Sequence, residues 1–131
     1  MPSSLKNLRN VIVCDDIREE VGGKHSLMGV FGGDIVLNEL PGSIFLAFYM
    51  QYFPDPDEQE KMSFAVRLLL NEEQLVSGKF EVDPTKHKTI NLVLPRALVT
   101  FEKECDLRML VKVQDADEGE VARKRVSRQV S

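Results

Sequence analysis

The chain has 131 residues and a mass of 14.9 kDa, a length that fits one domain with its own hydrophobic core. Hydrophobic residues make up 43% of the chain and charged residues 29%, the composition of an ordinary globular protein. The formal net charge of −4 argues against a general nucleic-acid binder, because such proteins are usually basic.

The sequence predicts neither a membrane span nor a secretory signal. The longest apolar run, residues 44–53, is about half as long as a transmembrane helix. The N-terminal segment lacks the apolar stretch of a signal peptide. We therefore expect a cytoplasmic protein with no membrane partner. Cys14 and Cys105 occupy apolar strand positions, and we expect buried free thiols there in preference to a disulfide or a ligating pair.

Alternation of apolar and polar residues, typical of strands, begins near the N-terminus. Residues 11–15 and 26–31 are the first two predicted strands, with a glycine-containing turn at residues 20–24 between them. Residues 35–37 could continue the second strand after a bulge. Residues 44–53 are apolar on both faces, which predicts a central strand covered on both sides.

The second half of the chain shows the same alternation. Its predicted strands are residues 62–70, 75–82, 89–94, 98–101, 105–113 and 121–130. The first two of these strands, joined by a short polar loop at residues 71–73, predict a β-hairpin. Residues 95–104 and the tail after Asp117 are the only segments that also allow a helix.

These seven to nine short strands predict an all-β fold. The spacing favours an antiparallel two-sheet β-sandwich, immunoglobulin-like or C2-like, with a closed barrel as the second architecture. We expect a single domain over residues 1–131, with flexible ends at residues 1–9 and 120–131.

The segment from Cys14 to Gly29 has a recognisable pattern of residues. Cys14-Asp15-Asp16 is followed by Gly23-Lys24 and then by Gly29. This pattern resembles the opening of a family of small uncharacterised bacterial and phage-associated β-sandwich proteins. The resemblance covers the first quarter of the chain. It implies a sandwich of unknown function and transfers no activity and no catalytic residue.

The residues needed for catalysis are not gathered in any recognisable motif. His25 and His87 each stand beside a lysine in a predicted turn or loop, and no nucleophile motif accompanies them. The glycine pairs lie between predicted strands. A phosphate-binding loop would instead have to lead into a helix, so these glycines do not predict one. The two cysteines and two histidines are too scattered for a zinc site. We therefore expect no enzyme, no catalytic residue and no cofactor.

Calcium binding is the main chemical alternative. Some β-sandwiches bind Ca²⁺ through acidic loops at one end, because the ion takes several oxygen ligands in a flexible shell. The candidates here are Asp55 and Asp57 in one loop and Asp115 and Asp117 in another. A site requires the two loops to meet. Otherwise these are solvated turn residues, and the prediction for metals remains none.

Protein binding is the function that the sequence favours. Tyr49, Tyr52 and Phe53 would form an exposed aromatic interaction patch if they lie on the outer face of a sheet, and would otherwise belong to the core. Residues 44–53 offer more apolar surface than one sheet face hides, which favours a homo-oligomer. We expect a non-catalytic interaction or assembly module with an unidentified protein partner. A calcium- or ligand-binding sandwich is the alternative.

The C-terminal segment is basic and invites one further interpretation. Residues 122–131 contain three arginines and one lysine in an otherwise acidic chain. Such a segment is typical of a solvated edge strand or a frayed terminus, and nucleic-acid contact is the alternative. Because no aromatic residues are interleaved, we expect no nucleic-acid partner.

Overall fold

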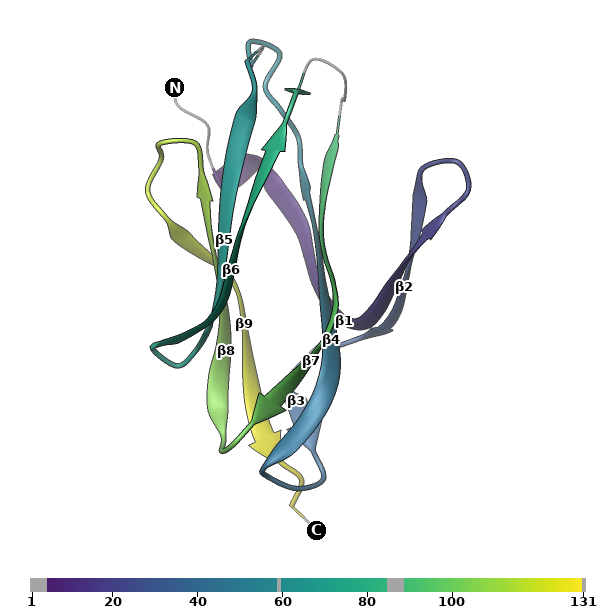
Figure 1. The fold of residues 1–131 in the computed structure, drawn as a ribbon, viewed down its shortest axis with the longest axis vertical. Coiled ribbons are helices and arrows are strands. Elements are labelled where there is room, and N and C mark those ends of the chain that lie inside the picture. Colours follow the sequence, from purple (N-terminus) through teal and green to yellow (C-terminus); the bar gives the residue numbers. More distant parts are fainter. Residues whose placement is uncertain (1–4, 59, 85–88, 131) are drawn as a thin grey trace.

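The computed structural model describes residues 5–58, 60–84 and 89–130, and within these ranges nine strands form two packed sheets (Figure 1). The strands are β1 (Leu8–Glu20), β2 (Lys24–Val30), β3 (Ile35–Leu37), β4 (Gly42–Tyr52), β5 (Met62–Leu70), β6 (Glu73–Val82), β7 (Ile90–Phe101), β8 (Cys105–Val113) and β9 (Gly119–Arg128), preceded by the 3₁₀ turn η1 (Leu5–Asn7). The predicted all-β sandwich is confirmed. A closed barrel is excluded, because the strands divide into two sheets.

The four-stranded sheet has the order β2-β1-β4-β7, and the five-stranded sheet has the order β3-β9-β8-β5-β6. The strand pairs in the two sheets are antiparallel, except that β3 runs parallel to β9. The predicted hairpin is confirmed as β5–β6, with Asn71 in the left-handed region at φ 55° in its turn. Residues 95–104, the segment that also allowed a helix, belong largely to β7.

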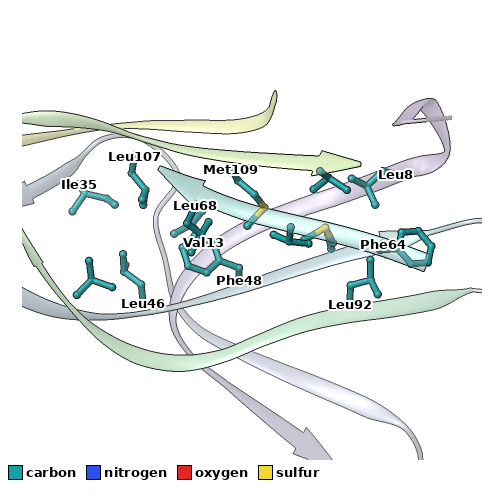
Figure 2. Close-up of a cluster of buried hydrophobic side chains, with 14 of the residues drawn as sticks. Leu8, Val13, Ile35, Leu46, Phe48, Phe64, Leu68, Leu92, Leu107 and Met109 are labelled. Atoms are coloured by element: carbon teal, nitrogen blue, oxygen red, sulfur yellow. The ribbon is translucent and has the colours of Figure 1, made fainter. Parts of the chain in front are cut away.

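The core lies between the sheets and follows directly from the alternation. Along β5, Met62, Phe64, Val66 and Leu68 are buried, while the residues between them point outward. Figure 2 shows Leu46 and Leu92 of the four-stranded sheet lying across from Leu107 and Met109 of the five-stranded sheet. Each fully buried side chain of this size contributes roughly 1.5–3 kcal/mol. This layer of side chains therefore holds the two sheets together.

Strand β4 is central, as predicted, but only one of its faces packs into the core. Its neighbours are β1 and β7, and Leu46 and Phe48 point into the core. On the opposite face Phe45 is exposed and Tyr49 is half-buried. The prediction that both faces are covered is therefore wrong along most of the strand. Ala47 is the exception: it is fully buried although alternation turns it away from the core.

Strand β3 does not continue the second strand. Ile35 and Leu37 are buried in the five-stranded sheet, where Ile35 pairs with Val126 of β9. The chain crosses between the sheets after Gly32-Gly33, since burying two large aliphatic side chains is favoured over extending an exposed strand. Strand β9 thus lies between β3 and β8 and is not an edge strand, and it takes up most of residues 120–131, the end expected to be flexible.

Within the described residues, no helix has the length and hydrophobicity that crossing a membrane requires.

Candidate interaction surfaces

The predicted aromatic patch is divided by the structure. Tyr52 is 0% exposed and packs edge-to-face against Phe64, with 5.1 Å between ring centroids. Its hydroxyl donates to the carboxylate of Glu58 at 3.0 Å, which satisfies the buried polar atom. Of the two alternatives for Tyr52, the exposed patch and the core, the structure shows the core. Phe53 is half-buried beneath the Arg9 guanidinium, which lies 5.7 Å from the ring centroid.

Tyr49 does lie on the outer face of the four-stranded sheet, but its neighbours there are polar. Its hydroxyl donates to Asn91 Oδ1 at 3.2 Å, and Gln51 Nε2 donates to the same oxygen at 3.1 Å. The ring of His25 packs against Tyr49 at 5.6 Å between centroids. Desolvation raises the pKa of the Tyr49 phenol. This part of the face carries a satisfied hydrogen-bond ladder, so it is not an apolar patch.

The contact with His25 comes from an arm that projects from the sandwich. Strand β1 pairs with β4 only as far as Cys14, and beyond it residues 15–20 pair with β2 alone. Figure 1 shows the two strands bending away from the four-stranded sheet as a separate hairpin. We call residues 15–30 the arm. Two-stranded ribbons are marginally stable alone, so the arm depends on its base.

The base of the arm is built by the segment that carried the resemblance. Cys14 is fully buried, and its thiol donates to the Ala47 carbonyl at 3.7 Å. Gly29 adopts φ 67°, and the carboxylate of Asp15 occupies the space that a side chain there would need. The carboxylate of Asp16 accepts the Ile17 amide at 2.9 Å, so it caps its own neighbour and not the turn at the tip. These residues have structural roles.

A second surface lies on the opposite side of the sandwich, where the two sheets end without covering each other. The edge strands β6 and β7 border a hollow of about 350 Å³ whose floor reaches the core at Leu46, Phe48, Leu68 and Val99. Its rim consists of Leu75, Val76, Leu94, Pro95, Ala97 and Leu98. We call this the apolar groove. Sequence reasoning missed it, although the adjacent Leu75 and Val76 break the alternation of an otherwise polar strand.

The outer face of the five-stranded sheet is charged but internally neutralised. Arg67 binds Glu118 through two nitrogens at 2.7 and 2.8 Å, and Arg108 and Arg123 both bind Glu120. These hydrogen bonds lower the pKa values of both glutamates. The β9 arginine Arg123 is thus engaged by carboxylates, which agrees with a structural role for the basic C-terminal strand.

Comparison with known proteins places the chain in a family. A model described as a family of unknown function (DUF6941) matches residues 9–122, which is most of the chain. The chain belongs to this family. No curated protein matches it. The description of the family assigns no activity, ligand or partner, in agreement with the expectation of an uncharacterised β-sandwich family. The matched range includes both the arm and the apolar groove.

The calcium candidates of this family member do not gather into a site. Asp55 and Asp57 follow β4, and Asp115 and Asp117 lie between β8 and β9. Across residues 5–58, 60–84 and 89–130, no three His, Cys, Asp or Glu side chains are grouped so that they could hold a metal ion. In the first loop, Glu58 is already engaged by the Asp55 amide at 2.8 Å. Calcium binding stays a prediction without structural support.

The cysteines and histidines named from the sequence are buried, lie in the arm, or fall outside the described residues. Cys14 and Cys105 are buried free thiols, as predicted, and burial raises both pKa values. His25 lies in the arm against Tyr49, and His87 falls outside the described residues.

Proposed function

We propose that the protein is a non-catalytic module that binds another protein chain at the apolar groove. The observation that carries this proposal is the exposure of three large aliphatic side chains, Leu75, Val76 and Leu98, around a hollow that leads into the core. Exposed apolar side chains grouped around a concavity mark protein interaction sites, because covering them removes apolar surface from water.

The backbone beside the groove supports the same function. Strand β6 ends the five-stranded sheet, so the amide and carbonyl groups along its outer edge have no strand partner in the described structure. An extended segment of a partner could pair with this edge and direct alternate side chains into the groove. Strand addition of this kind combines backbone hydrogen bonds, which give affinity, with side-chain pockets, which give specificity.

The lining of the apolar groove offers no catalytic group. The groove is lined by aliphatic and aromatic side chains and Pro95, none of which is a nucleophile or a base. Histidine, the commonest general base, is represented in the described residues by His25 alone, on the arm. Binding is the chemistry that this surface supports best.

Site-specific photo-crosslinking tests the proposal with a matched control. The photoreactive residue p-benzoylphenylalanine is placed at Val76 in the groove, which is 49% exposed, or at Val36 in β3, which is 54% exposed. We expect protein adducts in cells from position 76 and far fewer from position 36. Equal yields, or no adduct at position 76, would contradict the proposal. Adding millimolar Ca²⁺ should leave the yields unchanged.

A further inference from the structure

The identity of the partner follows from a comparison of the sheet edges, and it rests on the proposed function. The four edge strands are β2 and β7 of one sheet and β3 and β6 of the other. Strand β7 is interrupted by Pro95 near a register shift, and β3 has three residues. Strand β2 carries Gly29 in a left-handed conformation. Prolines and irregularities of this kind discourage further pairing.

Strand β6 has one irregularity, a register shift at Leu75, and the segment from Gly78 to Val82 pairs with β5 without interruption. The strand has 10 residues without proline, and most of them are exposed. Its outward face bears Lys79 and Glu81, whose cross-strand partners in β5 are the uncharged Ala65 and Ser63. Within the described part of the chain, no ion pair includes either charge.

We infer that the partner is a second copy of this chain, bound by antiparallel pairing of the two β6 strands around a two-fold axis at Phe80. In this register, Lys79 of each copy lies opposite Glu81 of the other, and Gly78 lies opposite Val82. The order Lys-Phe-Glu is self-complementary, because an antiparallel copy presents the opposite charge at each position. Such isologous contacts are the commonest form of homo-oligomer.

The positions of Lys79 and Glu81 distinguish β6 from an edge strand whose charges prevent pairing. A lysine on an edge strand usually prevents pairing. Here the acid two residues further along lies on the same face, so the copy that meets the lysine supplies its counter-charge. Opposite charges directly across an antiparallel pair stabilise it, and like charges destabilise it. Registers centred on Lys79 or on Glu81 place like charges opposite each other, so the charges disfavour these two registers relative to the one centred on Phe80.

The inner face of the strand supplies the apolar part of the contact. Phe80 lies opposite Phe64, which packs against the buried Tyr52. Pairing about Phe80 brings the two Phe80 rings side by side on the groove side of the sheet, since directly opposed residues place their Cβ atoms roughly 5 Å apart. Val76 and Val82 share this face. The paired segment, residues 78–82, thus adjoins the apolar groove, whose lining residue Val76 lies two positions before it on the same face.

Charge reversal followed by mixing tests the register. The wild-type protein is measured by sedimentation equilibrium beside the single variants Lys79→Glu and Glu81→Lys. Each single variant sets like charges opposite each other twice per dimer, so we expect its dimer dissociation constant to rise about tenfold or more. An equimolar mixture of the two variants restores opposite charges at both positions and should restore the dimer. The double variant Lys79→Glu/Glu81→Lys should also dimerise.

The controls separate association from folding. Lys103→Glu reverses an exposed lysine in the bend between β7 and β8 and should leave the dimer unchanged. Neither Lys79 nor Glu81 takes part in an ion pair within the described structure, so thermal unfolding measured at low concentration should be the same for all variants. The difference between single variants and mixture should shrink at high salt, because exposed charges are screened.

Each result bears on one claim. A wild-type protein that remains monomeric up to about 1 mM, the range of very weak complexes, overturns the self-pairing. Single variants that dimerise like the wild type, or a mixture that stays monomeric, overturn it as well. If Val76 crosslinks to a different protein while the wild type is monomeric, binding at the groove survives and only the second copy is refuted. Absence of adducts at position 76 refutes the proposed function itself.

Discussion

Substitution of Gly29 by alanine tests the account of the arm most directly. Gly29 has φ 67°, and a Cβ atom built on it overlaps the carboxylate of Asp15. The left-handed conformation costs an L-residue about 1–2 kcal/mol. Displacing the Asp15 side chain from its rotamer costs about 0.5–1.5 kcal/mol more. We therefore expect Gly29→Ala to lower the free energy of unfolding by about 1.5–3.5 kcal/mol, a large part of the stability of an ordinary domain.

The assay is urea denaturation followed by circular dichroism, with two reference variants. Gly33→Ala is the control, because its φ is not in the left-handed region and no atom lies within 4 Å of the added Cβ. It should change the stability by less than about 0.5 kcal/mol. Asp15→Ala/Gly29→Ala removes the overlap with the carboxylate but keeps the close Asp15 Cβ atom and the backbone cost, so its stability should lie between that of Gly29→Ala and that of the wild type. A Gly29→Ala protein as stable as the Gly33→Ala protein would refute the reasoning.

Three further predictions concern the core and the charged face. Tyr52→Phe removes the buried hydroxyl that donates to Glu58 and should lower the free energy of unfolding by about 1.5–3 kcal/mol in urea, the value of a hydrogen bond to a charged group. The pKa values of Glu118 and Glu120 are lowered in the folded protein, so their ion pairs stabilise it above the ordinary glutamate pKa. This stabilisation is lost as the pH falls through the lowered pKa values. Because Glu118→Gln removes one of these carboxylates, the urea midpoint of the variant should decrease less steeply with falling pH than that of the wild type. The Cys14 thiol is fully buried with a raised pKa, and a thiol reagent should modify it only at the rate of unfolding or local opening.

The fold was predictable where one face of a strand meets the core and the other meets water. Residues 62–70 alternate clearly over most of their length, and they form β5 within those limits. Residues 44–53 were harder, because a run that is apolar at every position does not reveal which face is inward. In the structure, two features decide which side chains of β4 are buried. One is the register shift between Leu46 and Phe48, and the other is the arm, whose base lies beside Ala47. Neither feature has a signature in the local pattern.

The candidate surfaces were less predictable, because they depend on which strand edges come together. Leu75 and Leu98 are 23 positions apart in the sequence and belong to different sheets, yet both line the apolar groove. Sheet membership is a long-range property that alternation does not encode. Tyr52 was left open between the exposed patch and the core, and its hydrogen-bond partner Glu58, which lies beyond the end of the strand, could not be inferred from the alternation.

The most distinctive segment of the sequence and the surface that we propose for binding are therefore different places. Cys14, Asp15 and Gly29 are engaged with one another's strands and with Ala47, and this is enough to explain why those residue types stand there. Within the described residues, the outer edge of strand β6 has no strand partner and no ion pair includes Lys79 or Glu81, so these residues are available for the proposed pairing. The residues at the base of the arm are explained by the fold and therefore say little about binding. The exposed, self-complementary segment from Lys79 to Glu81 is not required by the fold, and this is why we propose it as the site of self-pairing.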